Sequence, residues 1–528
     1  MKRYFLHIII TGITAGLYSC DRDLLDTIPN DRISSAVYWQ TPDDALLAIN
    51  SAYGDLEGVE IFSYDALTDI AHTNDPFNVQ ANIEKGVYDA LNTVIYSRWT
   101  AAYKGIESAN YFLENVDRIS DLTPALKTRY KAEARTLRAY QYIRLLPLFG
   151  DLPKVERTLT LDEARQLTRT PAAELWAWLD SQLQTAADSL PETYDAANTG
   201  RITKWAALGL KARAALLAGN YRTAADAATQ IISSQQFSLY PKYEHLFSYE
   251  AENNAEVILD RQFIKGSYAN SVFNLLAPYS QNNANNSYVP TKALIDLYQT
   301  AGGVDIATAG SGYDPSTPYD NRDPRLRFSI FIDGDILPNG DVFHSAPNSD
   351  GADAVGKSYR NTTTGFTVKK YVNADDFGNG ANCGINIILL RYAEVLLTYA
   401  EAKIELNEID PTVYDAINLV RNGRDDVKLQ AVSGLSQPQL REVVRRERTV
   451  ELAFEGLHLA DIRRWRTAET VLPGKILGLE YDDNGTRKVV EVASAVRTFR
   501  PDRDYLWPIP QKERDLCNLL TQNPNWGE

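Results

Sequence analysis

Cysteine is scarce in this sequence. The 528-residue chain contains three, and Cys20 lies in an N-terminal segment that differs in character from the rest. The remaining two, Cys383 and Cys517, cannot build a disulfide framework, so the fold must be held together by its core. After residue 20 no apolar run is long enough to cross a bilayer as a helix. These absences exclude a small disulfide-rich secreted domain and a multi-span membrane protein.

Catalytic motifs are also missing. The sequence contains no H-E-x-x-H, C-x-x-C or G-x-S-x-G pattern and no glycine-rich phosphate loop, which argues against a metallohydrolase, a redox protein, an α/β-hydrolase and a nucleotide-dependent enzyme. A glycosidase needs only two carboxylates, and 69 acidic residues offer many pairs, so motif absence leaves this class open. We predict a protein that is not an enzyme, has no catalytic residues and needs neither a cofactor nor a metal.

Positive charge is in short supply. The chain has 54 Lys and Arg against 69 Asp and Glu, a formal net charge of −15, which argues against a nucleic-acid binder and against recruitment to anionic membranes. Aromatic residues are abundant, with 30 Tyr and 8 Trp. Such rings suit a sugar-binding site, where they cover the apolar face of the sugar, and they equally suit the core of a large helical protein.

The N-terminus is organised like a signal peptide. Lys2 and Arg3 precede a mostly apolar run that is too short to span a membrane as a mature helix. The segment Leu17-Tyr18-Ser19-Cys20 resembles the lipobox of bacterial lipoproteins, although Tyr18 departs from the small residue usual there. The resemblance implies a signal peptide at 1–19 and lipid attachment to Cys20. An ordinary secretory signal and a cytosolic protein with an apolar start are the alternatives.

Apolar residues recur at helical spacing over the first 240 residues and again from residue 389. The expected helices come in pairs, and the stretch ALLAGNYRTAADAATQII (215–232) resembles a tetratricopeptide repeat, whose helix pairs bury their apolar faces by stacking on neighbours. We predict a mainly α fold with a scaffold of tetratricopeptide-like helix pairs. The predicted helices span 43–53, 97–116, 125–146, 172–190, 204–218, 221–233, 389–407 and 413–421, with another beginning near 438.

A different kind of sequence separates the two helical blocks. Residues 241–385 are rich in Asn, Asp, Gly, Ser and Tyr, with turn signals at Asp333-Gly334 and Asn339-Gly340 and a β-type run at 327–332. We predict a loop-rich insertion in which strands are confined to short β-hairpins, and a further hairpin at the Asn484-Gly485 turn. The acidic residues of 333–341 favour a hairpin with acidic turns; a Ca²⁺ site is the alternative, although EF-hand spacing is absent.

Charged residues are dense in RRERTVELAFE (445–455), where Arg and Glu lie i,i+4 apart on one predicted helix. This spacing favours an ion-paired surface or an inter-helix network, and a catalytic carboxylate pair is the alternative. Asp323-Pro324-Arg325 predicts a turn, because Asp can bond backbone N–H groups and Pro fixes φ. We interpret this turn as a structural latch.

Two segments offer what a sugar site requires, which is an aromatic face beside amide or carboxylate side chains. The first is HTNDPFN (72–78), and the second runs from Tyr279 to Tyr288, with two more tyrosines farther along. Packing of each ring on its own domain is the alternative. The predicted ligand-binding residues are His72, Asn74, Asp75, Phe77, Tyr279, Asn282, Asn283, Tyr288, Tyr313 and Tyr319.

Six stretches spread over nearly the whole chain after the signal peptide stand out: LLDTIPNDRISSAVYWQTPDDALLAINSAYGDL (24–56), LRAYQYIRLLPLFGDLPKV (137–155), NRDPRL (321–326), LLRYAEVLLTYAEAKIEL (389–406), RRERTVELAFEGLHLADIRRW (445–465), and YLWPIPQKE followed by QNPNW near the end. In this order they resemble the SusD/RagB family of outer-membrane nutrient-binding lipoproteins. The sequence departs from the family at His458-Leu459-Ala460, where a more aromatic triplet is common, and at QNPNW, where Gly often follows Pro.

The resemblance implies one domain over 20–528, made of a helical scaffold (24–240 and 386–470), a variable ligand-binding insertion (241–385) and a C-terminal segment (471–528). It also implies a lipid-anchored protein on the exterior of the outer membrane that binds oligosaccharides or polysaccharides and delivers them to a SusC-like TonB-dependent transporter. Peptide capture, known for part of the family, a surface glycoside hydrolase, and a scaffold without a small ligand are the alternatives.

Overall fold

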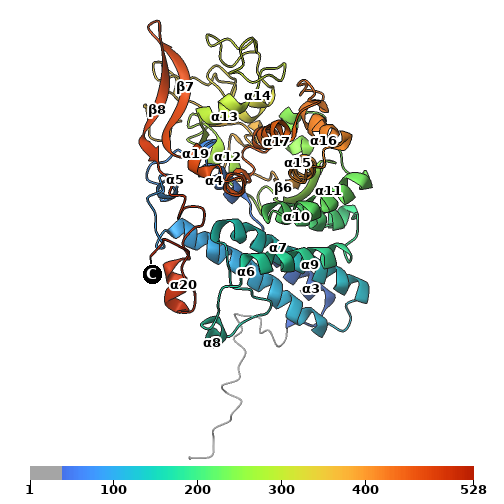
Figure 1. Cartoon of the computed structure of the whole chain (residues 1–528). Helices are drawn as coiled ribbons and strands as arrows, with labels where there is room; N and C mark the ends of the chain where they lie inside the picture. The colour runs from blue at the N-terminus through green and yellow to red at the C-terminus, as the bar shows by residue number, and fades with distance from the viewer. Residues whose placement is uncertain (1–37, 528) are drawn as a thin grey trace, which may run out of the picture.

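The structure is a computed structural model that describes residues 38–527, and it is mainly helical, as the sequence predicted. Five long helices follow one another in the first half, and each packs on the next (Figure 1). An additional helix, α3 (Pro42–Tyr53), packs on the first two of them. The five are α6 (Thr93–Asn115), α7 (Pro124–Phe149), α9 (Ala172–Ala187), α10 (Lys204–Leu217) and α11 (Tyr221–Ser234).

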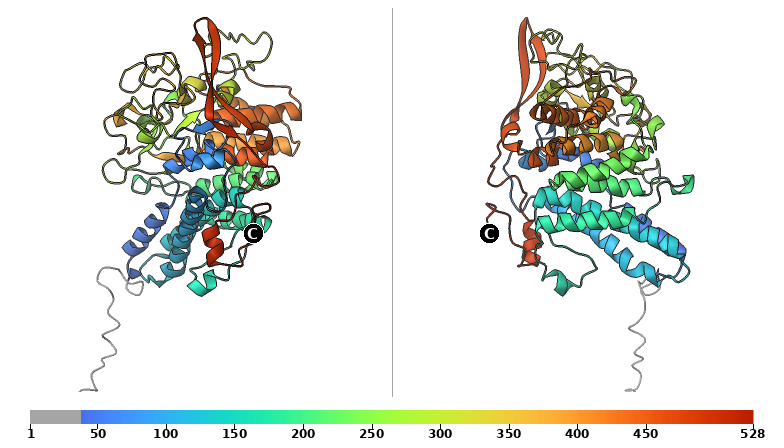
Figure 2. Two further views of the ribbon diagram at one scale, coloured as in Figure 1. Left: turned by 90° about the vertical axis from the view of Figure 1, so that its left-hand side faces the viewer. Right: turned by 45° about the vertical axis from the view of Figure 1, so that its right-hand side comes forward.

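The stack continues across the insertion. Helix α15 (Tyr392–Glu405) packs directly on α11, although more than 150 residues separate them, and it also contacts α16 (Pro411–Asn422) and α17 (Gln437–Glu451). Figures 1 and 2 show this succession of helical layers from several sides. Helix pairs from both blocks therefore form one stack, which confirms the tetratricopeptide-like prediction.

Small residues and local caps explain the close packing of the helix pairs. Gly219, in the left-handed region at φ +74, ends α10, and the side chain of Asn220 then caps α11 by accepting from the backbone N–H of Thr223. The buried side of α11 is built mainly from alanines that meet α10 and α15. Gly209 of α10 is equally tight, because a Cβ there would lie 2.4 Å from a methyl of Leu390. Larger side chains at these positions would push the layers apart.

Helix α7 continues past the proline at which the sequence predicted its end. Pro147 lies inside the helix, which stops at Phe149 before Gly150 (φ +70). The residues around the proline, Leu146 and Leu148 among them, are buried. Burial of this apolar turn outweighs the hydrogen bond that the proline ring removes.

Strands are few, and within the described residues they form four two-stranded antiparallel sheets. The hairpin of β7 (Gly474–Asp483) and β8 (Thr486–Arg497) extends beyond the body of the molecule (Figure 2). Its turn residues Asn484 and Gly485 have φ of 54° and 81°, so the predicted Asn-Gly turn is confirmed.

The other three sheets join distant segments, so the prediction that strands occur only in short hairpins is wrong. A sequence pattern carries no information on such pairings, because the partners lie far apart along the chain. The β-type run at 327–332 is also helical in its first half, where Pro324 precedes α14 (Arg325–Ser329). The pairs are β1 (Ala71–Thr73) with β3 (Tyr288–Pro290), β2 (Val257–Arg261) with β6 (Ile387–Arg391), and β4 (Ile330–Phe331) with β5 (Thr367–Val368).

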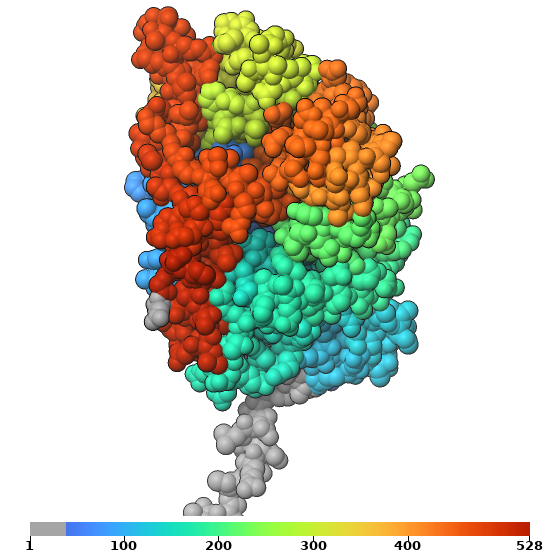
Figure 3. Space-filling model, in the orientation of Figure 1, coloured from blue at the N-terminus to red at the C-terminus, as the bar shows by residue number. Residues whose placement is uncertain are grey.

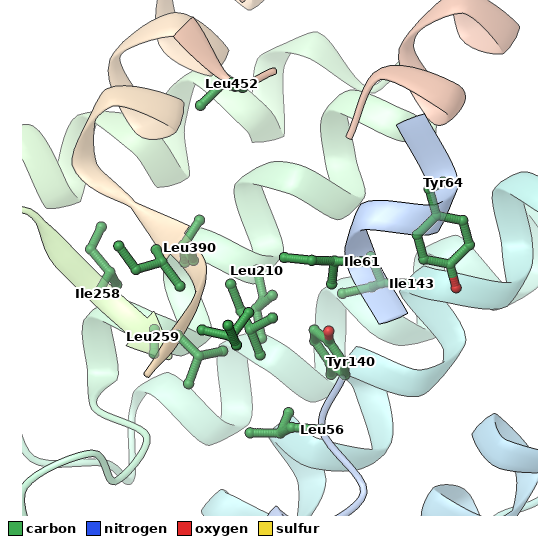
Figure 4. Close-up of a cluster of buried hydrophobic side chains, with 14 of the residues drawn as sticks. Leu56, Ile61, Tyr64, Tyr140, Ile143, Leu210, Ile258, Leu259, Leu390 and Leu452 are labelled. Carbon is green, nitrogen blue, oxygen red and sulfur yellow. The ribbon is translucent and has the colours of Figure 1, made fainter. Parts of the chain in front are cut away.

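Scaffold, insertion and C-terminal segment share one large hydrophobic core. Figure 4 shows part of it, where Leu56, Tyr140 and Leu210 of the scaffold meet Leu259 and Leu390 of the paired strands β2 and β6. The insertion loops form the upper surface beside the β7–β8 hairpin (Figure 3). The proposed division into segments of a single domain stays a prediction. The short helices not yet given are α4 (Phe62–Asp65), α5 (Gln80–Glu84), α8 (Leu161–Ala164), α12 (Val272–Leu276), α13 (Lys292–Leu297), α18 (His458–Arg464), α19 (Ala468–Val471) and α20 (Gln511–Leu516).

A buried ionic network ties these parts together. Glu451 of α17 accepts from Arg391 Nη1 at 2.7 Å, from Arg424 Nη2 at 2.9 Å and from Arg325 Nη1 at 3.0 Å. Asp323 accepts from the backbone N–H of Arg325 at 3.0 Å and pairs with its guanidinium, as expected of a latch. The complete network consists of Arg325, Lys370, Arg391, Arg421 and Arg424 with Glu256, Asp323, Glu447, Glu451 and Glu455.

The predicted i,i+4 pairing within α17 is not what the structure shows. Glu447 and Glu451 are fully buried and pair with arginines of other elements, and Arg448 likewise pairs with Asp461 of α18 at 2.7 Å. The inter-helix half of the prediction is therefore confirmed, and the surface half is wrong. Burial decides between them, since a buried carboxylate must be neutralised by charges that surround it in space.

Candidate ligand-binding site

The two segments predicted to bind ligand lie side by side. Strand β1 pairs with β3, which places Thr73 opposite Tyr288, and the backbone N–H of Asn74 donates to Ser287 O at 2.9 Å. More than 200 residues separate these segments in the sequence. The pairing brings the 72–78 and 279–288 loops to one region of the molecule.

Two aromatic rings stand exposed in this region. The side chain of Phe77 is 81% exposed and that of Tyr359 is 54% exposed, and their ring centroids lie 6.2 Å apart with planes at 75°. Asp75 Oδ1 accepts from the Phe77 N–H at 2.9 Å, which forms the tight turn that presents the phenyl ring. Large rings left in water beside one another are typical of a ligand surface. We call Phe77 and Tyr359 the aromatic platform.

The loop that carries Tyr359 is held from both sides. Asn74 Nδ2 donates to Asn361 O at 3.0 Å, and its Oδ1 accepts from the Thr363 N–H at 2.8 Å. On the other side, Asp353 Oδ1 accepts from the Ser280 N–H at 2.9 Å. Burial raises the pKa of the Asp353 carboxyl. These bonds join the loop at 353–361 to both predicted segments, so Asn74 positions the platform rather than facing it.

Unpartnered amides lie at the 279–283 loop. Asn282 and Asn283 adopt left-handed backbone conformations, with φ of 56° and 59°, which Asn tolerates better than most residues. Both side chains are exposed, and within residues 38–527 neither side-chain amide group has a hydrogen-bond partner. Tyr279 beside them is half-buried. The 279–283 loop thus offers hydrogen-bond donors and acceptors for the hydroxyl groups of a ligand, and it is bonded to the loop that carries Tyr359.

Other predicted residues have internal roles. His72 is buried, with Nδ1 2.6 Å from Glu84 Oε1. Tyr288 is also buried, and burial raises its pKa. His72, Asn74 and Tyr288 are each less than a tenth exposed, and Tyr288 still lines a cavity, so direct ligand contact at these three residues stays a prediction. The sequence pattern could not separate them from Phe77, since it does not show which loop side chains turn inward.

Tyr313 and Tyr319 lie at the β7–β8 hairpin. The hydroxyl of Tyr319 accepts from the Glu480 N–H at 3.3 Å, and the guanidinium of Arg322 lies 5.5 Å from the centre of the Tyr313 ring. Ligand contact at this second location stays a prediction, as it does for Asp75, Phe77, Tyr279, Asn282 and Asn283. Sequence reasoning missed Tyr359, although GKSYRN (356–361) has the same signal, an aromatic residue among polar ones in a loop.

The acidic residues near 333–341 serve a hairpin. Asp333 Oδ1 accepts from the Ser345 N–H at 2.7 Å, and Asp335 Oδ2 accepts from the Ile332 N–H at 2.9 Å. Ile336 and Val342 form the bridge between the two arms. The hairpin interpretation therefore fits better than the Ca²⁺ alternative, because internal donors already occupy these carboxylates.

The described residues bear on only part of the membrane-related predictions. Cys20 lies outside the described residues. Among residues 38–527, no helix combines the length and the apolar character that a membrane span would need.

The described chain is thus a stack of helix pairs whose loops carry two exposed aromatic rings side by side. The chain matches the family model described as "SusD family" over residues 244–526, and a second, "Starch-binding associating with outer membrane", over residues 44–216. The chain belongs to the SusD family, as its sequence motifs predicted.

Similar proteins cover nearly the same length. SusD-like protein P2 of Formosa agariphila is 26% identical over 558 residues, with 100% of each chain covered. A SusD-like carbohydrate binding protein of Bacteroides fragilis has a solved structure that is 30% identical, with a TM-score of 0.85 over 92% of this chain and 100% of that one. Surface glycan-binding protein A of Bacteroides thetaiotaomicron, solved in complex with laminarihexaose, is 20% identical with a TM-score of 0.71 over 92% and 100% of the chains, and shares the fold.

Proposed function

We propose that this protein captures oligosaccharides through the aromatic platform and the amides beside it. The observation that carries the proposal is the exposure of Phe77 and Tyr359 next to a loop with unpartnered Asn side chains. An aromatic ring covers the apolar C–H face of a sugar, and amides bond its hydroxyls. The names of the similar proteins, a carbohydrate binding protein and a laminarihexaose complex among them, support this ligand class.

Modest affinity follows from the same physics. Each sugar hydroxyl exchanges a hydrogen bond to water for one to the protein, for a net gain of about 1 kcal/mol, and each stacked ring adds about as much. A ligand held in this way dissociates readily, which suits delivery to a second protein. We propose that the ligand leaves chemically unchanged and passes to a SusC-like TonB-dependent transporter.

We further propose that the protein is anchored at the exterior of the outer membrane by lipid on Cys20. The lipobox-like segment and the description of the second family model support this location. In cell fractionation, Cys20→Ala should move the protein from the membrane to the soluble fraction or leave it uncleaved, since two or three acyl chains supply the anchoring energy. Membrane retention of a cleaved Cys20→Ala protein would contradict the anchor.

The binding proposal is tested with Phe77→Ala, Tyr359→Ala and the double variant. Affinity gels and calorimetry with laminarin and other polysaccharides, and with peptides, should show the parent binding a glycan and the double variant binding it at least about tenfold more weakly. Leu161→Ala is the matched control, because Leu161 is also an exposed apolar side chain (65%) but lies on α8.

Three results would count against the proposal. Unchanged binding by the double variant would show that the platform is not the site. Binding of peptides in place of glycans would favour the peptide alternative. Release of reducing ends by the parent protein would favour the glycoside hydrolase alternative.

A further inference from the structure

Apart from the aromatic platform, a polar cleft lies between the helical scaffold and the start of the insertion. It consists of two adjoining cavities of about 590 and 520 Å³, sizes that suit small ligands. The larger cavity reaches Asn78, the neighbour of Phe77, and the smaller one extends to Tyr268. Gly54, Leu56 and Arg261 line both cavities, so these residues mark the point where they meet.

Arg261, the last residue of β2, is fixed at this meeting point. Its Nη1 donates to Leu56 O at 2.6 Å and its Nη2 donates to the Tyr268 hydroxyl at 2.7 Å. The guanidinium also lies 5.2 Å from the centre of the Phe263 ring. These contacts hold the guanidinium plane in one orientation, which lowers the entropy cost of binding a ligand to it.

The charge of Arg261 has no carboxylate partner within ion-pair distance in the described part of the chain. The other basic side chains of the larger cavity differ in this respect: Arg98 and Arg144 pair with Glu57, and Lys104 pairs with Asp55. Glu60, the remaining acid there, accepts from the Gly58 N–H at 2.8 Å, and its pKa is lowered, against the effect of burial, by backbone hydrogen bonds and by the charges of Arg98 and Arg261. Arg261 thus acts on Glu60 at a distance but forms no ion pair among residues 38–527, and a fixed guanidinium of this kind can still take up a ligand carboxylate.

The groups around Arg261 are those of a sugar site. Tyr268 is 46% exposed, and its ring stacks on Phe263 with centroids 5.6 Å apart and planes at 15°. Asn50 and Gln262 line the smaller cavity, each held by a neighbour: Arg201 donates to Asn50 Oδ1 at 2.7 Å, and Gln262 donates to Asp260 Oδ1 at 2.9 Å. An aromatic ring, two amides and a guanidinium together match a sugar that carries a carboxylate.

We propose that this cleft binds a uronic acid unit of an oligosaccharide, with its carboxylate on Arg261 and its ring beside Tyr268. The proposal rests on the proposed glycan binding and deepens it, because it names a carboxylated glycan as the ligand class. Among the described basic residues that line the cleft, Arg261 alone forms no ion pair, so the cleft suits a glycan with sparse carboxylates better than a densely charged polyanion.

The test compares carboxylated oligosaccharides with their carboxyl-reduced counterparts. Glucuronoxylan oligosaccharides and oligogalacturonate are measured by calorimetry before and after reduction of the carboxyl group to the alcohol. The parent should bind at least one carboxylated form about tenfold or more tightly than its reduced form. Arg261→Gln should remove this preference. Ser51→Trp, which fills the cleft from an exposed position on α3 and keeps Arg261, should weaken binding of the carboxylated form.

The outcomes separate this proposal from the platform. A parent that binds both forms equally, or an Arg261→Gln protein and a Ser51→Trp protein that both keep the preference, would overturn the uronic acid site while leaving the platform in place. The Phe77→Ala/Tyr359→Ala variant should bind both forms more weakly and retain their ratio. A parent that binds no glycan at all would overturn both proposals.

Discussion

Replacing Glu451 by glutamine should destabilise the protein by about 3–5 kcal/mol at neutral pH. Glu451 is fully buried and accepts charge-assisted hydrogen bonds from three arginines at 2.7, 2.9 and 3.0 Å. Glutamine keeps the shape but removes the charge, and its amide NH₂ would face guanidinium N–H groups where a carboxylate oxygen now lies. The buried arginines would then lack a counter-charge, which costs more than the hydrogen bonds alone.

Urea unfolding followed by tryptophan fluorescence measures this effect, as a lower midpoint at an unchanged slope. Glu442→Gln is the matched control, because Glu442 is exposed on the same helix, and the change there should stay within about 0.5 kcal/mol. A loss of less than 1 kcal/mol in Glu451→Gln would refute the reasoning, since it would mean that the network tolerates an unbalanced charge.

The pH dependence provides an independent check. The surrounding arginines hold the pKa of Glu451 below its usual range. A carboxyl with a depressed folded pKa stabilises the protein above its unfolded pKa of about 4.3, and this stabilisation is lost as the pH falls toward the folded value. The deficit of Glu451→Gln should therefore be full at pH 7 and shrink below about pH 4.

Two further predictions concern single positions. Burial raises the pKa of Asp260 to about 6, so ionisation of this carboxyl opposes folding as the pH rises through that value. In urea unfolding, Asp260→Asn should be more stable than the parent by about 2–3 kcal/mol at pH 8, and this difference should vanish near pH 4. If the variant were more stable by the same amount at both pH values, burial of the Asp260 charge would not be the cause. At Gly478 of β7, a Cβ would lie 2.0 Å from Thr364 O, so Gly478→Ala should cost about 1–3 kcal/mol and speed hydrogen exchange in β7 and β8. Gly378→Ala is the control, because a Cβ there meets nothing within 4 Å. Equal hydrogen-exchange rates in both variants would show that the close approach of Gly478 to Thr364 does not control the stability of the hairpin.

Local pattern predicted the helices well because each long helix buries a periodic apolar face. The predicted spans 97–116 and 204–218 lie within a few residues of α6 and α10. The end of α7 differs, because packing of the turn around Pro147 overrides a local rule, and the predicted helix 389–407 begins too early, because residues 389–391 belong to strand β6. The strand pairs could not be predicted, since Thr73 finds its partner at Tyr288 and no local signal encodes that register.

The site could be predicted as a region but not residue by residue. The segments 72–78 and 279–288 do meet, at the β1–β3 pair, yet exposure within 72–78 varies from 0% at Thr73 to 81% at Phe77. Loop composition is similar for an aromatic side chain that packs inward and for one that faces solvent. The ion pairs of the charged helix α17 could not be predicted for a similar reason, because the arginines that pair with Glu447 and Glu451 lie on elements that the sequence does not place beside them.

The pairing of β2 with β6 has a consequence for how this scaffold can change. Arg261 and Ile387 are register partners, so the intervening chain leaves and re-enters the scaffold at adjacent points. The entropy of closing a loop between fixed ends grows only with the logarithm of its length, and a twofold longer loop costs about 0.6 kcal/mol more. The exposed loop at 306–317 can therefore be exchanged for a longer or shorter one at little thermodynamic cost, provided that Asp323 and Arg325 are kept. Grafting a loop at this point offers a route to new ligand specificity on an unchanged helical frame.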